Sequence, residues 1–283
     1  MQIFKLSGAS PGQLEARRSG EYSIATCGAD YSDSDTWAYG ILGISDFLER
    51  FPGHRVFEGL RSDLAGRLFQ RWCDAAKPQW NWFEDRLGYD NARLCEALFI
   101  SGKATGNPDQ FEAGLDALRW LMKLQTAARG HFRPIGTQTF GADYRQPQPF
   151  DQQPLEAWAA VSACLTAARL TGDRWWKHEA ERAFAWFLGE NDLGIPVADI
   201  ARGACFDGLH PDRRNANQGA ESTLAYLAAL TAMSRAAAAQ PSLLARFGPS
   251  NAMAVECECN LRAHGAHTLA PATPGSWSVA GRE

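Results

Sequence analysis

Residues 206–230 bring together side chains suited to acid–base chemistry. The segment reads FDGLHPDRRNANQGAESTLAYLAAL, with acidic and amide residues in front of an almost uncharged run. Cleavage of a sugar linkage requires two carboxyl groups about 5 to 10 Å apart across a cleft, one protonated and one ionised. We rank Asp207 and Glu221 first, because Gly208 permits a tight turn and Glu221 begins an apolar helix, where desolvation would raise its pKa.

Two earlier segments, WNWFEDRLGYDN and FDQQPLEA, supply further candidates, and Glu84 is the next choice for a catalytic carboxylate. Amides both donate and accept hydrogen bonds, aromatic faces suit a pyranose ring, and histidine titrates near neutral pH. Trp82 is our choice for a stacking platform. The residues that we expect to bind a substrate are Trp82, Asp85, Tyr89, Asp90, Asn91, Asp151, Gln152, His210, Asn217 and Gln218.

Each candidate also has a purely structural interpretation. Asp207 is suited to hydrogen bonds within a turn, and Glu221 to the free N–H groups of a first helical turn. Asp151 is a good N-cap ahead of Pro154, and the aromatic residues are suited to packing between helix ends. The sequence leaves these alternatives open.

Two kinds of helix must position these residues. Segments 56–72, 110–125 and 174–188 have one apolar and one charged face, which predicts amphipathic outer helices. Apolar or small residues cover almost the whole circumference of four other segments, which predicts inner helices buried on both sides. These inner segments are 36–48, 91–102, 155–170 and 222–233.

The connections between these helices also alternate. Short joins that contain glycine (RFPGHR, ATGNPD and LTGDRW) follow the inner helices, and long polar loops precede them, with a period of roughly 55 to 65 residues. Parallel inner helices, surrounding outer helices and long loops at one end describe an α/α toroid. We therefore predict an all-α fold, with the polar residues facing a central cleft.

Four motifs carry a resemblance to a known family. WNWFEDRLGYDNARLCEAL, FDQQPLEAWAAVSACLTAARLTGD, RAFAWFLGENDLGIPV and DGLHPDRRNANQGAESTLAYLAAL resemble the six-hairpin glycosidase-like domain found behind family 4 glycosyltransferases in many bacteria. The resemblance covers about residues 36–236, and it implies a carbohydrate-active domain with an oligosaccharide or polysaccharide ligand and a glycosyltransferase partner.

This chain departs from that family in extent. A six-hairpin ring needs about twelve helices, whereas the pattern here supplies about seven or eight, and we expect no glycosyltransferase region within these 283 residues. We expect an incomplete toroid over residues 36–238, an unplaced segment over 1–35 and an Ala/Pro/Gly-rich tail over 239–283. An open ring exposes the sides of apolar inner helices, so we expect it to favour homo-oligomers.

Composition excludes several other classes of function. The chain has 283 residues, 45% of them hydrophobic, with a net charge of -4 and no block of like charges, so a nucleic-acid or membrane partner is not expected. We predict a cytoplasmic protein, since the first residues lack a secretory signal. No phosphate-binding glycine loop, nucleophile elbow or HExxH motif occurs, and we expect no cofactor.

The seven cysteines are scattered, which predicts reduced and mostly buried thiols. One spacing, CECNLRAHGAH, leaves open a zinc site built from Cys257, Cys259, His264 and His267. C-x-C is not the usual zinc knuckle and the tail is rich in small residues, so we expect no metal.

Two functions remain open at this stage. The first is an enzyme that hydrolyses glycans, with epimerase or lyase chemistry as variants, and the second is a glycan-binding module or a shortened remnant. A hydrolase needs two carboxylates that face each other across a cleft, whereas a binding module can use amides and aromatic residues alone.

Overall fold

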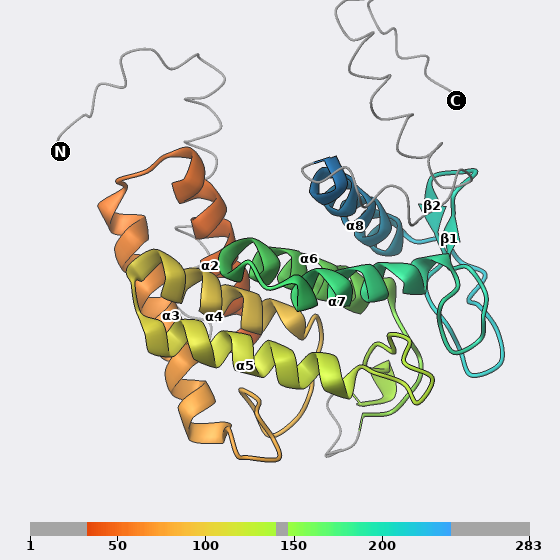
Figure 1. The fold of residues 1–283 in the computed structure, drawn as a ribbon, viewed down its shortest axis with the longest axis horizontal. Helices are drawn as coiled ribbons and strands as arrows, with labels where there is room; N and C mark the ends of the chain where they lie inside the picture. The colour runs from red at the N-terminus through yellow and green to blue at the C-terminus, as the bar shows by residue number, and fades with distance from the viewer. Residues whose placement is uncertain (1–32, 140–146, 239–283) are drawn as a thin grey trace, which may run out of the picture. The chain divides into compact units, whose positions relative to one another are not determined.

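A computed structural model describes residues 33–139 and 147–238, and these residues form an incomplete α/α toroid of helical hairpins (Figure 1). The predicted all-α fold class is therefore confirmed. The helices are α2 (Ser34–Arg50), α3 (Arg55–Ala75), α4 (Ala92–Thr105), α5 (Pro108–Leu124), α6 (Pro154–Thr171), α7 (Arg174–Ala185) and α8 (Ala220–Ala238). Two 3-10 turns, η1 (Thr137–Thr139) and η2 (Trp186–Leu188), and two short antiparallel strands, β1 (Ala198–Asp199) and β2 (Ala204–Cys205), complete the described elements.

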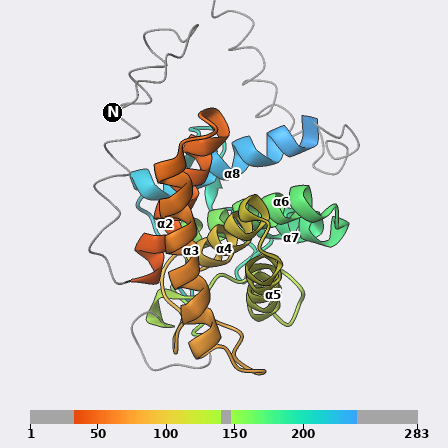
Figure 2. The ribbon, with the colours of Figure 1, turned by 90° about the vertical axis from the view of Figure 1, so that its left-hand side faces the viewer.

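The helices pack as hairpins in chain order. α2 packs against α3, α4 against α5, and α6 against α7, and the inner helices α2, α4 and α6 pack against one another in that order. Figures 1 and 2 show α4 between α2 and α6. All seven predicted helical segments are present, and each helix extends a few residues beyond its predicted segment at one end or both, except α7, which ends where η2 begins.

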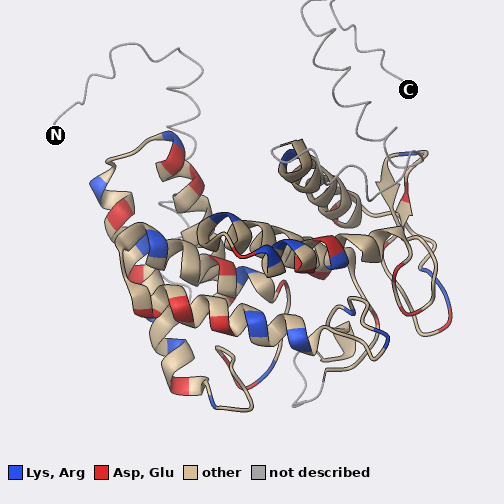
Figure 3. Cartoon of the chain, viewed as in Figure 1, with Lys and Arg blue, Asp and Glu red and all other residues tan. Residues whose placement is uncertain are grey.

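The two kinds of helix differ in where they place charge. α5 buries Leu115, Leu118 and Met122 on one side and carries charged residues on the other, whereas α6 is apolar or small along most of its length. Figure 3 shows acidic and basic residues spread along α5 and few along α8. The core therefore lies between the inner helices and one face of each outer helix.

The first and last of the predicted inner helices, α2 and α8, are less buried than the sequence predicted. Tyr39 on α2 is 46% exposed, and Leu224 on α8 is 65% exposed. α4 packs against a neighbouring inner helix on both sides, whereas a helix at an open end leaves one side uncovered. The prediction of burial on both sides fits α4 best, holds for only part of α6 and is wrong for α2 and α8.

Two of the glycine-containing joins end their helices as predicted. Gly106 after α4 and Gly172 after α6 are left-handed C-caps, with φ angles of 69° and 74°. A side chain is disfavoured in that conformation, which explains the glycine at each position.

Three parts of the chain lie outside the described residues: 1–32, 140–146 and 239–283. The four residues of the zinc alternative, Cys257, Cys259, His264 and His267, are among them. Within residues 33–139 and 147–238, no helix is long and apolar enough to cross a membrane.

Candidate functional site

The N-terminal ends of α2, α4, α6 and α8, with the loops that precede them, form what we call the N-terminal rim. Side-chain hydrogen bonds join its members: Tyr39 on α2 donates to Asp90 before α4 (2.6 Å), and Tyr89 donates to Glu221 on α8 (2.7 Å). Asp90 donates its backbone N–H to Glu156 on α6. The long loops before the inner helices thus gather at one end of the helices, as the toroid prediction requires.

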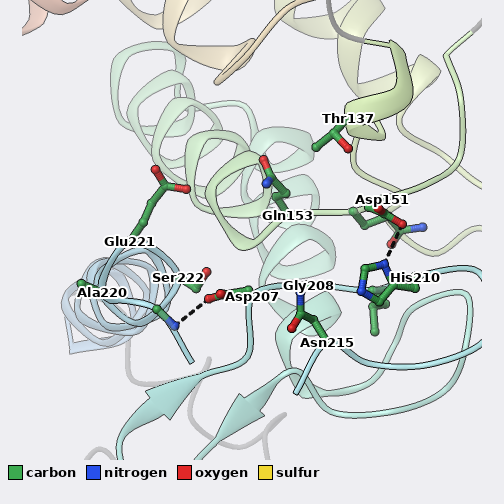
Figure 4. A pocket seen from close by; sticks show the side chains of 13 residues that line it. Thr137, Asp151, Gln153, Asp207, Gly208, His210, Asn215, Ala220, Glu221 and Ser222 are labelled. Carbon is green, nitrogen blue, oxygen red and sulfur yellow. Dashed lines mark hydrogen bonds and ion pairs between the residues drawn. The ribbon is translucent and has the colours of Figure 1, made fainter. Parts of the chain in front are cut away.

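A pocket of about 410 Å³ opens at this rim, between the starts of α6 and α8. We call it the rim pocket. Figure 4 shows Glu221 on one side, the Asp151 and His210 side chains on the other, and Asp207 and Gly208 between them. Its lining consists of Thr137, Asp151, Gln152, Gln153, Asp207, Gly208, Leu209, His210, Asn215, Gly219, Ala220, Glu221 and Ser222.

Asp151 and His210 form a pair within the rim pocket. The distance from His210 Nδ1 to Asp151 Oδ1 is 2.9 Å, and both side chains are partly exposed. Their two loops are joined by a backbone bridge in which Gln152 and Leu209 exchange N–H···O bonds of 2.9 and 3.0 Å. A histidine beside a carboxylate can carry a proton to or from a bound molecule.

Gly208 allows these two loops to approach so closely. Its φ angle is 142°, and a Cβ added there would lie 2.0 Å from the carbonyl oxygen of Gln152. No larger residue fits this position without displacing the backbone. The tight turn after Asp207 that the sequence predicts is therefore present, and it sets the spacing between Asp151 and His210.

Asp207 lies at the start of α8, where its carboxylate accepts a hydrogen bond from the Gly219 N–H at 2.7 Å and another from the Asn217 amide. Burial alone would raise the pKa of Asp207, but the hydrogen bonds from Asn217, Gly219 and Ser222 lower it below its usual value. Asp207 is thus held ionised, and its negative charge faces the positive end of the α8 dipole.

Glu221 is exposed in the first turn of α8. The burial that the sequence predicted for Glu221 is therefore not found, and its carboxylate accepts a hydrogen bond from the Tyr89 hydroxyl at 2.7 Å. Burial and this bond raise the pKa of Tyr89 above its usual range, so Tyr89 remains a hydrogen-bond donor to Glu221.

A second group of acids lies beside the rim pocket, around the start of α4. Asp90 is buried, and its Oδ1 has no hydrogen-bond partner among the described residues. Burial raises the pKa of Asp90, although the Arg93 charge and the Tyr39 hydroxyl oppose the shift. Burial and the charge of Asp90 raise the pKa of Glu156 to about 8, and burial together with Glu84 raises that of Asp35 to about 6.

Four predicted site residues are engaged elsewhere. Trp82 is 1% exposed and stacks on Trp120 with ring centroids 5.8 Å apart, so the prediction of a sugar platform is wrong. Asn91 is buried, its amide nitrogen donates to Glu156 and to the Gly88 carbonyl, and its amide oxygen accepts from the Gly88 N–H, so the side chain is engaged within the protein. Glu84 accepts a hydrogen bond from Ser34 and does not line the rim pocket.

The fourth, Gln152, lines the rim pocket, but its side-chain amide makes its hydrogen bonds to residues inside the protein. The side chain is fully buried, donating to Asp192 (2.6 Å) and accepting from the Trp186 indole (2.8 Å). Asp192 is held in turn by Arg133 and by His131. Gln152 is therefore a structural residue, and the prediction that its amide binds a substrate is wrong.

The remaining predicted binding residues divide between the rim pocket and its surroundings. Asn217 bonds to Asp207 and Gln218 to Asp199, and neither lines the pocket. Asp85 is exposed on the loop before α4, close in sequence to Tyr89 and Asp90. The lining also includes Thr137, Gln153, Asn215 and Ser222, and the acidic group includes Tyr39 and Glu156, none of which is among the binding residues expected from the sequence.

No family model matches this sequence, and no curated protein matches it. Among solved structures, the fold is similar to that of α/α-toroid proteins. An unsaturated glucuronyl hydrolase from Bacillus sp. GL1, responsible for the degradation of glycosaminoglycan, matches with a TM-score of 0.62 and 13% identity. The match covers 87% of this chain and 67% of that chain.

Two further structures of the same kind match. A UGL variant together with dGlcA-Glc-Rha-Glc has a TM-score of 0.62 and 13% identity over 90% of this chain and 70% of that one. An unsaturated glucuronyl hydrolase specific for heparin has a TM-score of 0.47 and 16% identity over 62% of this chain and 50% of that one. At these identities the likeness concerns the fold, and this chain spans only part of each neighbour.

Proposed function

We propose that this chain is a carbohydrate-active domain of the glycoside hydrolase kind, which holds a glycan in the rim pocket. The observation that carries the proposal is the placement of Glu221 opposite the Asp151–His210 pair, with the ionised Asp207 between them (Figure 4). Two carboxyl groups from different loops are the minimum for glycoside cleavage. The shared toroid fold supports the proposal without assigning the reaction.

In this assignment the Asp151–His210 pair passes a proton to the leaving oxygen. His210 Nδ1 lies 2.9 Å from Asp151 Oδ1, so the carboxylate orients the imidazole ring. Glu221, held by the Tyr89 hydroxyl, is the facing carboxylate that activates a water molecule. Asp207 supplies a fixed negative charge near the positive charge that develops on the sugar ring.

The second candidate is a glycan-binding module, with or without a glycosyltransferase partner. Two observations favour it: Asp207 is already bound to the start of α8, and Glu221 is exposed. Both carboxylates then serve the structure or bind hydroxyl groups, and no turnover occurs.

One experiment separates the two candidates. Purified protein is screened against manno- and gluco-oligosaccharides and against an oligosaccharide that ends in an unsaturated glucuronyl residue, by thermal shift and by product analysis. We expect turnover of at least one substrate, with kcat reduced about 100-fold or more in both Asp151→Asn and Glu221→Gln.

The matched control is Asp63→Asn, which removes an exposed carboxylate on α3, far from the rim pocket in the sequence and outside its lining. It should turn over substrate like the unmodified protein. Binding without turnover, unchanged in Asp151→Asn and Glu221→Gln, would establish the binding module instead, and a complete lack of binding would reject both candidates.

A further inference from the structure

A second pocket of about 360 Å³ lies at the other end of the inner helices. Its walls come from the last turns of α2, α4 and α6 and from the first turns of α3, so we call it the C-terminal pocket. This end holds the short glycine joins, to which the sequence assigned no function. Its volume falls in the range of small-molecule sites.

Arg61 on α3 is the unusual member of this lining. Arg61 as a residue is only 9% exposed, and its Nε is buried with no hydrogen-bond partner among the described residues. Burial lowers the pKa of the Arg61 guanidinium, and the charge of Glu58 opposes the shift only in part. A buried cation is costly unless an anionic group pairs with it, and a guanidinium binds a carboxylate through two parallel hydrogen bonds.

Five other charged residues line the C-terminal pocket: Asp46, Glu49, Glu58, Lys103 and Arg169. Lys103 and Arg169 lie in the last turns of α4 and α6, where a cation complements the helix dipole, so each has a structural explanation. Arg61 has none. Within the described ranges, no ion pair joins Arg61, Lys103 or Arg169 to the three acids.

The acids restrict which ligand fits. Asp46, Glu49 and Glu58 are exposed at the pocket and repel an anion of high charge, while they attract a cationic group. A molecule with one carboxylate and one ammonium group complements both the basic and the acidic residues of the pocket. Its carboxylate can pair with Arg61 while its ammonium group faces the acids.

We propose that the C-terminal pocket binds a small zwitterionic molecule of the amino-acid class, with Arg61 as the anchor for its carboxylate. This site is separate from the rim pocket, and the proposal stands whether or not the chain cleaves glycans. Arg61 has no role in the rim pocket, so the two proposals fail independently.

The test measures binding of the free L-amino acids to the intact protein by thermal shift and by isothermal titration calorimetry, with acetate and methylamine as single-charge probes. At least one amino acid should bind more tightly than either single-charge probe. Arg61→Met retains the apolar stem and removes the guanidinium, so it should weaken that binding about tenfold or more. Without ligand, its melting temperature should not fall, because the variant removes a buried unpaired charge.

Arg67→Met, an exposed position on the same helix, is the matched control and should bind like the unmodified protein. Arg61→Lys keeps the charge without the planar fork and should bind with intermediate affinity, which tests the site even if Arg61→Met folds poorly. The proposal is overturned if no amino acid binds, if acetate binds as tightly as the amino acids, or if Arg61→Met and Arg61→Lys bind like Arg67→Met.

Discussion

Asp207 combines a place in the rim pocket with a structural contact at the start of α8. Its carboxylate accepts from Gly219, the residue before the helix, and from the Asn217 amide. Local hydrogen bonds thus lower its pKa, and a residue chosen from the sequence as one of two catalytic carboxyl groups is held as an anion. The chemical type was predictable, whereas the protonation state depended on which N–H groups the fold placed around it.

Replacing Asp207 by alanine should destabilise the protein by about 1 kcal/mol, the usual cost of losing a side-chain contact to a helix start. The contribution should be present above the unfolded-state pKa of about 3.9 and disappear as the pH falls through the lower folded-state value. Urea unfolding from acidic to neutral pH measures it. Asp212→Ala removes an exposed carboxylate that pairs with its neighbour Arg213, and it should change little. Equal effects of the two variants would contradict this role.

At the scale of elements, Glu156 ties the start of α4 to the first turn of α6. Its carboxyl group accepts from the Asp90 backbone N–H and from the Asn91 amide, and it is completely buried. These bonds stabilise the ionised form, yet burial and the charge of Asp90 outweigh them and raise the pKa to about 8. The junction of two inner helices therefore holds a carboxyl group that is mostly protonated at neutral pH.

This junction predicts a pH dependence of stability. Because the folded-state pKa of Glu156 lies above its unfolded-state value of about 4.3, the unfolded chain binds fewer protons between the two. The free energy of unfolding should therefore fall as the pH rises from about 5 to about 8. Chemical unfolding of Glu156→Gln should show a flatter profile over that interval. The exposed Glu112→Gln on α5 serves as the control, and a profile for Glu156→Gln as steep as that of the control would refute the assignment.

At the scale of the whole molecule, the row of hairpins has two uncovered ends in the described part of the chain. Leu224 and Leu227 are exposed on α8, at 65% and 38%, and Tyr39 is exposed on α2. α8 is anchored through Tyr226, whose ring lies 5.5 Å from that of Phe187, so only one of its sides packs on the core. Apolar side chains that stay in water favour association with another apolar surface.

We expect the protein to self-associate as its concentration rises, and the double variant Leu224→Gln/Leu227→Gln to shift it toward the monomer by removing the apolar contact. Sedimentation velocity over a concentration series measures this. Val56→Gln, on α3 and 71% exposed, is a matched exposed apolar control and should leave the association unchanged. A monomer at every concentration would show that the exposed face of α8 does not mediate self-association.

The sequence by itself determined the helices and their order. Segment 155–170 is apolar around most of its circumference, whereas segment 110–125 has a single apolar face. This difference separates inner from outer helices, and the sequence shows it directly because helical periodicity is a local property of the chain. The glycines of the short joins and the lengths of the long loops then place the polar residues at a common end. Fold class and the location of a candidate site follow from that pattern.

Only the tertiary structure decided which of those polar residues face the pocket. Asp151 meets His210 across 59 positions of sequence, and Tyr89 meets Glu221 across 132. Trp82 and Gln152 carry suitable chemistry but are buried, since neighbouring helices and loops cover them. A side chain can cap a helix, pack in the core or face a cavity. Contacts between distant segments decide among these outcomes, and local sequence patterns do not encode those contacts.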